Sequence, residues 1–183
     1  MRCVGIDYSM TSPAMCIWDG DGPPEFVGCE VHFLTDLKKC VGFYSNMSGW
    51  QMPEWSTPEE RFDLISDAFL RHLRESDRVV LEGYAFAAKG QVYQIGENGG
   101  LLKHKLYRKG IWFDVVAPSV IKKHGTGKGN ADKALMEQAF VTSQGVDLRK
   151  ALSLTDRQQN PVSDIIDAFY MCSYCHALAS ADE

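Results

Sequence analysis

The pattern of apolar and polar residues along the chain predicts an alternation of strands and helices. Short apolar runs at residues 2–7, 14–19 and 25–33, separated by turn-rich segments, predict three antiparallel strands at the start. Apolar runs at 78–82 and 111–116 predict two more strands. Residues 34–57 have no clear period, so we expect an irregular insertion there.

Apolar residues at steps of three and four predict the helices. The clearest helix is expected over 58–74, with Thr57 as its N-cap and Glu60 completing a capping box. Others are expected at 91–109, after a cap at Ser119, at 131–144, and from Pro161 to about residue 179. This order predicts an α/β fold in which one mixed five-stranded sheet is flanked by helices.

Composition excludes several classes of protein. The chain has 183 residues, 45% hydrophobic and 23% charged, which is typical of one folded domain over residues 1–183. No apolar run is long enough to span a membrane and no secretory signal is visible, so we expect a cytosolic protein with free thiols. Cys172, Cys175 and His176 have the spacing of a haem or zinc half-site, but no second pair completes it.

The charge is unevenly distributed. The formal net charge of −5 argues against a protein that binds nucleic acid simply by being basic. Between Lys103 and Lys133, however, eight lysines and arginines stand against Asp114 and Asp132. Such a basic patch on an acidic body can follow phosphates, although by itself it is more typical of a solvated face.

The last predicted helix carries an acidic pair in an apolar segment. Asp164 and Asp167 are three residues apart, so both project from one face of the helix. An unpartnered carboxylate is costly to bury, which predicts a basic side chain or a divalent cation nearby. A favourable interaction with the helix N-terminus is the alternative explanation.

Two further acids end predicted apolar strands, where they do not favour a sheet. Asp7 follows Cys-Val-Gly-Ile, and Glu82 follows Val-Val-Leu. Together with Asp164 and Asp167 they form a candidate site for Mg²⁺ or Mn²⁺, which prefer oxygen ligands. Two such ions, roughly 4 Å apart, serve in phosphodiester hydrolysis.

Four segments resemble the conserved blocks of RuvC-type Holliday junction resolvases, of the ribonuclease H-like superfamily. They are GIDYSMTSP at 5–13, VVLEGYAF at 79–86, APSVIKKHGTGKGNADK at 117–133 and SDIIDAF at 163–169, in the family's order. The resemblance implies a ribonuclease H-like fold, metal ligation by Asp7, Glu82, Asp164 and Asp167, and catalytic lysines at Lys122 and Lys133.

The sequence also departs from the family. Residues 8–13 lack the expected glycine-containing turn, and Ala85 stands where the bacterial enzymes have an aromatic residue. Tyr84 or Phe86 is therefore the candidate wedge at a DNA branch point, with core packing as the alternative. Residues 34–57 also form a longer segment than the resemblance implies, which is typical of a divergent phage, viral or organellar member. The candidate DNA-binding lysines are Lys103, Lys105, Lys122, Lys123, Lys128 and Lys133.

The function implied is cleavage of four-way DNA junctions by paired symmetric nicks, leaving 5′-phosphate and 3′-hydroxyl ends, with two Mg²⁺ or Mn²⁺ ions in each active site. Two opposed nicks call for a homodimer, for which we expect the helix at 91–109 to form the interface. Two alternatives stay open. One is a related nuclease acting on flaps or RNA–DNA hybrids, and the other is a branched-DNA-binding module without catalysis.

Two nucleotide-binding readings fail. The loop GTGKGN at 125–130 is not part of a P-loop. Gly127 and Lys128 would align with the Gly-Lys of that motif, but Lys122 then stands where it requires Gly, and Gly129 where it requires Ser or Thr. An actin-like ATPase also begins with a strand, an Asp and a turn, but its two lobes need a much longer chain.

Overall fold

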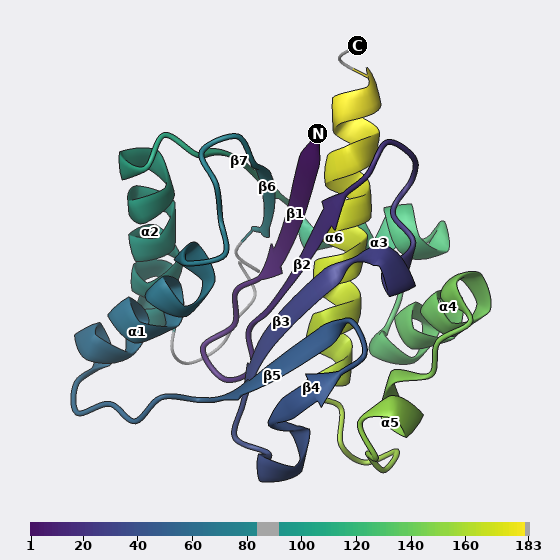
Figure 1. Cartoon of the computed structure of the whole chain (residues 1–183), viewed down its shortest axis with the longest axis horizontal. Helices are drawn as coiled ribbons and strands as arrows, with labels where there is room; N and C mark the ends of the chain where they lie inside the picture. Colours follow the sequence, from purple (N-terminus) through teal and green to yellow (C-terminus); the bar gives the residue numbers. More distant parts are fainter. Residues whose placement is uncertain (84–91, 182–183) are drawn as a thin grey trace.

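The computed structural model describes residues 1–83 and 92–181, and places a mixed sheet between two layers of helices (Figure 1). The strand order is β4-β5-β3-β2-β1-β6-β7. The strands are β1 (Arg2–Asp7), β2 (Ala14–Asp19), β3 (Glu30–Thr35), β4 (Gly42–Tyr44), β5 (Met47–Gln51), β6 (Arg78–Glu82) and β7 (Trp112–Val116). The helices are α1 (Pro58–Leu70), α2 (Val92–Arg108), α3 (Pro118–Thr126), α4 (Lys133–Gln144), α5 (Leu148–Ala151) and α6 (Val162–Ala181).

The start of the chain forms the predicted antiparallel meander. β1 pairs with β2 and β2 with β3, both antiparallel. β6 then pairs with β1, and β7 with β6, in parallel. Parallel neighbours need a crossover connection, which α1 and α2 provide. The α/β class with a mixed sheet flanked by helices is therefore confirmed.

The predicted number of strands was wrong, because the sheet described here has seven strands rather than five. Residues 34–57 are not irregular throughout: β5 pairs with β3 in parallel, and β4 pairs with β5. These two strands are short and contain glycines, so their sequence has little periodicity of its own. Pairing supplies the order: β3 is the partner of β5, and β5 is the partner of β4.

Helix boundaries agree with the sequence pattern in most places. Thr57 caps α1, with its Oγ1 accepting a hydrogen bond from the Glu60 backbone N–H. The cap of α3 was predicted wrongly: it is Ala117, with Pro118 as the first helical residue, so Ser119 lies inside the helix. Residues 145–160, which show no helical period, contain only the short α5.

Each face of the sheet has its own core. Val4 and Ile6 of β1 pack with α1 and α2, whereas Cys3 belongs to the core under α6. In β6, Val79 and Leu81 face the first core and Val80 faces the second. Alternate residues of a strand point to opposite faces. Asp7 and Glu82, at the ends of these two strands, therefore point to the α6 side.

None of the helices in the described ranges is both long and apolar enough to cross a membrane. The thiols of Cys172 and Cys175 are buried and donate to the backbone carbonyls of Cys3 and Arg78. This pair packs against the sheet instead of forming a half-site with His176.

Candidate active site

The site lies where the ends of β1 and β6 meet the beginning of α6. Gly5 allows this contact, because a Cβ atom there would lie 2.2 Å from the carbonyl oxygen of Ala168 and 2.2 Å from the backbone nitrogen of Cys172. Asp7 is two residues further along β1, and Asp164 is one turn before Ala168 on α6. The contact between β1 and α6 therefore places Asp7 and Asp164 close together.

Asp7 and Asp164 form the buried part of the cluster, with 9% and 6% of their surfaces exposed. Burial raises the pKa of Asp7 well above its usual range, and the negative charges of Asp164, Asp167 and Glu82 raise it further. Burial also raises the pKa of Asp164. The Ser12 hydroxyl opposes this shift by donating a hydrogen bond of 2.8 Å to Asp164 Oδ2.

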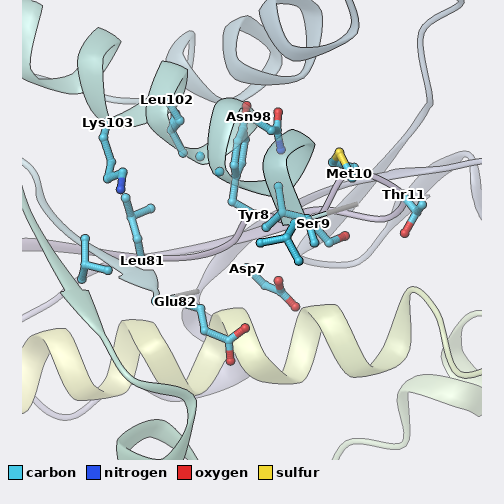
Figure 2. Close-up of a pocket in the computed structure, with 16 residues that line it drawn as sticks. Asp7, Tyr8, Ser9, Met10, Thr11, Leu81, Glu82, Asn98, Leu102 and Lys103 are labelled. Carbon is cyan, nitrogen blue, oxygen red and sulfur yellow. The ribbon is translucent and has the colours of Figure 1, made fainter. Parts of the chain in front are cut away.

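Asp167 and Glu82 complete the set of four acids. Burial, followed by repulsion from Glu82 and Asp164, raises the pKa of Asp167 to about 7. The Glu82 side chain remains partly open to solvent, yet desolvation of its carboxylate still raises its pKa. Figure 2 shows the carboxylates of Asp7 and Glu82 directed from the strand ends towards α6. The structure thus brings together all four acids expected from the sequence.

The two candidate catalytic lysines approach this cluster from different helices. Lys133, the first residue of α4, lowers the pKa of all four acids and donates a hydrogen bond of 3.2 Å to Ser163 Oγ. Lys122 of α3 lowers the pKa of Glu82 and Asp167. The positive charges of two lysines therefore face four carboxylates.

The donor set fits hard divalent cations. The negative charges that raise the pKa of Asp7, Asp167 and Glu82 repel one another less when positive charge enters between them. In the part of the chain that the structure describes, no three of these four carboxylates bring oxygens within 4.8 Å of one another. With metal–oxygen bonds of about 2.1 Å, the ligand atoms of one ion lie within about 4.2 Å of one another, so an ion held by three of these acids would require their side chains to move closer together.

A cavity of about 530 Å³ adjoins the carboxylates on the side of α2 (Figure 2). Asp7 and Glu82 lie at its edge, and Leu81, Leu102 and Asn98 contribute to its wall. Asn98 is 1% exposed, and its Oδ1 has no hydrogen-bond partner among the described residues. Sequence reasoning missed Asn98 and Ser12, because neither belongs to a charged pattern.

The other candidate DNA-binding residues have different surroundings. Lys123 and Lys128 are exposed on α3 and the loop after it, while Lys103 lines the cavity. Lys105 is paired within the protein, with Nζ 2.6 Å from Asp63 Oδ1 and 2.7 Å from Asp67 Oδ1. Its charge therefore joins α2 to α1. The candidate wedge residues Tyr84 and Phe86 lie outside the described residues.

Comparison with known proteins identifies the fold. No protein-family model matches the chain, and no curated protein matches its sequence. Solved structures that match all of it include Thermus thermophilus RuvC, at 18% identity, and T. thermophilus RuvC in complex with Holliday junction substrate, at 16%. In both cases the TM-score is 0.60 and the match covers 100% of this chain and 96% of the other.

This chain therefore has a RuvC-like fold, as the four sequence blocks predicted. The likeness extends over the whole chain, including the strands and helix that carry the four acids. At such low identity it defines the fold, while the chemistry has to be argued from the site.

Proposed function

We propose that this protein is a metal-dependent endonuclease that cuts four-way DNA junctions. The observation that carries the proposal is the convergence of Asp7, Glu82, Asp164 and Asp167 from β1, β6 and α6, faced by Lys122 and Lys133. Asp7 and Asp164 would hold the ions from the buried side of the site, and Glu82 and Asp167 from its more open side. Two bound Mg²⁺ or Mn²⁺ ions supply the charge that activates water and stabilises the leaving oxygen in phosphodiester hydrolysis.

The lysines have a separate part in the proposed reaction. Lys133 is exposed and its charge reaches every acid of the cluster, so its ammonium would neutralise the phosphate at the scissile bond. Lys122, Lys123 and Lys128 continue the positive charge along α3 and its loop, where they would contact flanking phosphates. Lys105 is left out of this set because two aspartates already neutralise it.

Junction DNA is the favoured substrate because one of the structures with this fold, T. thermophilus RuvC, is in complex with a Holliday junction substrate. Paired symmetric nicks would require two copies of the site. We infer a homodimer formed through α2, which exposes Tyr93, Ile95 and Tyr107. We also infer that residues 1–183 act as one nuclease domain, since all parts of the proposed site come from across this range.

The test is cleavage of four labelled substrates by the purified protein with Mg²⁺, Mn²⁺ or EDTA. The substrates are a mobile four-way junction, a flap, a linear duplex and an RNA–DNA hybrid. We expect paired nicks at symmetric positions in the junction with either metal, and none with EDTA. Cleavage of the hybrid alone would establish the ribonuclease alternative instead, and junction binding without cleavage would establish the binding module.

Variants test the site itself. Asp7→Asn and Glu82→Gln should abolish cleavage while junction binding in EDTA remains, because each removes one metal-ligating charge and preserves the shape of the side chain. Asp114→Asn is the matched control, since Asp114 is an exposed acid of β7 that accepts a hydrogen bond from the N–H of Val115. Full cleavage by Asp7→Asn would overturn the proposed site.

A further inference from the structure

A second cluster of metal-ligand side chains lies on the opposite face of the sheet. Glu30 and His32 are neighbours on one side of β3, and His72 follows the end of α1. Val31 and Phe33 of β3 belong to the core under α6, so His32 points to the α1 side. The sheet therefore separates this cluster from the four carboxylates of the candidate active site.

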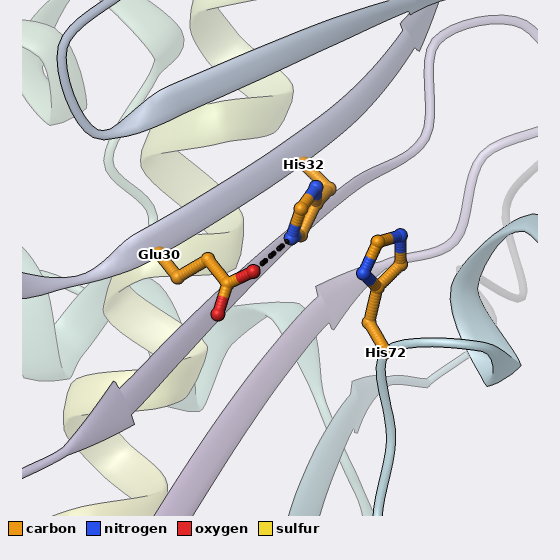
Figure 3. Close-up of side chains that lie close together, drawn as sticks. All are labelled: Glu30, His32 and His72. Atoms are coloured by element: carbon orange, nitrogen blue, oxygen red, sulfur yellow. Dashed lines mark hydrogen bonds and ion pairs between the residues drawn. The ribbon is translucent and has the colours of Figure 1, made fainter.

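The three side chains converge closely. One ligand atom from each lies within 4.8 Å of the other two, and no other group of three His, Cys, Asp or Glu residues in the described ranges meets this distance. His32 Nε2 is 2.8 Å from Glu30 Oε1, and the two imidazole rings stack with their centroids 3.7 Å apart. Figure 3 shows the Glu30 carboxylate at the edge of the His32 ring, with His72 on its other side.

Burial and charge suit a cation at this position. His32 is 5% exposed, and its Nδ1 is buried without a partner among the described residues. This nitrogen is on the other side of the ring from Nε2, the atom beside Glu30, so a water molecule bound there would orient the ring while Nε2 faces the ion. Glu30 is the acid that faces the rings, while Arg2, which pairs with Asp77 at 2.7 Å, and Arg71 add positive charge near His72.

We propose that Glu30, His32 and His72 bind a divalent transition-metal ion of the zinc class. Two imidazole nitrogens and one carboxylate oxygen form a familiar Zn²⁺ ligand set, with water as the fourth ligand. Tetrahedral ligands of Zn²⁺ lie about 3.3 Å apart, given metal–ligand bonds of about 2.0–2.1 Å. The three ligand atoms lie within 4.8 Å of one another, so Zn²⁺ binding would require His72, which is only partly buried and lies in the turn after α1, to move towards the other two ligands.

Such an ion would join β3 to the connection between α1 and β6. This site would also differ in metal selectivity from the carboxylate site, because Mg²⁺ takes oxygen ligands whereas imidazole favours Zn²⁺ and the neighbouring first-row transition metals. The two sites can therefore be separated by the choice of metal. The inference does not depend on the proposed nuclease activity, and cleavage assays neither support nor oppose it.

The experiment is a competition titration of Zn²⁺ against a chromophoric chelator, with millimolar Mg²⁺ present to occupy the carboxylate site. The wild-type chain should bind one equivalent of Zn²⁺ tightly. His72→Gln and Glu30→Gln should each weaken this binding by about tenfold to 100-fold, in the range measured for the loss of supporting groups at metal sites. His104→Gln, a change to an exposed histidine of α2, is the matched control and should bind like the wild type.

Loss of one ligand can be distinguished from loss of the fold. Glu30 is exposed and His72 only partly buried, so both variants should keep the wild-type circular dichroism spectrum. As a second measurement, one equivalent of Zn²⁺ should shift the ring ¹⁵N resonances of His32 and His72 in the unmutated protein and leave those of His104 in place. Zn²⁺ binding that is equal in wild type, His72→Gln and Glu30→Gln, or absent ring shifts, would overturn the proposal.

Discussion

The hydroxyl of Ser12 donates a hydrogen bond of 2.8 Å to Oδ2 of Asp164, and so connects the loop after β1 to the first turn of α6. The two residues are 152 positions apart in the sequence and both are buried. The same loop is anchored by Arg61 of α1, whose Nη2 donates to the carbonyl oxygen of Met10 at 2.6 Å. The orientation of a proposed metal ligand therefore depends on a loop that carries no charge of its own.

Removing this hydroxyl should impair cleavage without abolishing it. Ser12→Ala takes away the donor that lowers the pKa of Asp164, and a hydrogen bond to a charged group is worth about 1.5–3 kcal/mol. We expect kcat to fall by roughly tenfold to 100-fold and the Mg²⁺ concentration for half-maximal rate to rise. Ser180→Ala, at the far end of α6, should leave both unchanged. Wild-type kinetics for Ser12→Ala would show that the bond does not position Asp164.

The stability of the metal-free protein should fall as the pH rises. The pKa of Asp167 is about 7 in the folded protein, against an ordinary value of 3.8. A carboxyl group with a raised pKa favours folding when protonated, so its contribution is complete below about pH 4 and is lost as the pH rises through 7. Asp7, Asp164 and Glu82 shift in the same direction.

Thermal unfolding in EDTA at a series of pH values measures this effect. The Tm should decrease between pH 5 and about 8 in the wild type, and decrease less in Asp167→Asn. Millimolar Mg²⁺ should restore the Tm most at the upper end of this range, where the carboxylates are ionised. A Tm that is independent of Mg²⁺ at every pH would contradict the binding of the ion by these acids.

Substitution of two lysines of the basic segment, Lys133 and Lys105, should give opposite results. Lys133 faces all four acids, so Lys133→Ala should reduce kcat by roughly 100-fold, the scale found when one charge-stabilising donor is removed from an active site. Lys105 instead bridges Asp63 and Asp67 of α1. Lys105→Ala should lower the Tm while kcat and the salt dependence of junction binding stay close to wild type. A junction-binding defect specific to Lys105→Ala would restore its predicted role in DNA contact.

Much of the fold and the four acids could be predicted because strand periodicity carries three-dimensional information. Successive side chains of a strand point to opposite faces of the sheet. Once β1 and β6 are neighbours, this alternation fixes the face on which Asp7 and Glu82 lie. The i, i+3 spacing does the same for Asp164 and Asp167 on α6. These features are local in the sequence, and the sheet only brings them together.

What the sequence could not predict depends on partners distant in the chain. Met47–Gln51 becomes a strand because β3 is available for pairing, and Gly42–Tyr44 because β5 is, conditions that a three- or five-residue segment does not encode. The role of Ser12 is likewise set by Asp164, and that of Lys105 by two acids of α1. Lys105 counts as part of a basic patch in the sequence and as part of a helix contact in the structure.

Gly5 provides the sharpest test of how the fold sets up the site. Its missing side chain lets α6 lie directly on β1, and an added Cβ would meet two backbone atoms at 2.2 Å, neither of which can move without the helix. Gly5→Ala should therefore lower the free energy of unfolding by more than about 3 kcal/mol, beyond the usual cost of a single substitution. Displacement of α6 would carry Asp164 and Asp167 away from Asp7, so the remaining folded protein should cleave poorly.

The matched control, Gly100→Ala, should change the stability of the protein in the opposite direction. A Cβ at Gly100, in the middle of α2, meets no atom of another described element within 4 Å, and alanine is the better helix former by roughly 0.5–1 kcal/mol. Gly100→Ala should thus raise the Tm slightly, while Gly5→Ala lowers it severely, as measured by urea and thermal unfolding of both. Equal stability of the two variants would mean that the direct contact between β1 and α6 does not hold the acids together, and the geometric basis of the proposed site would have to be abandoned.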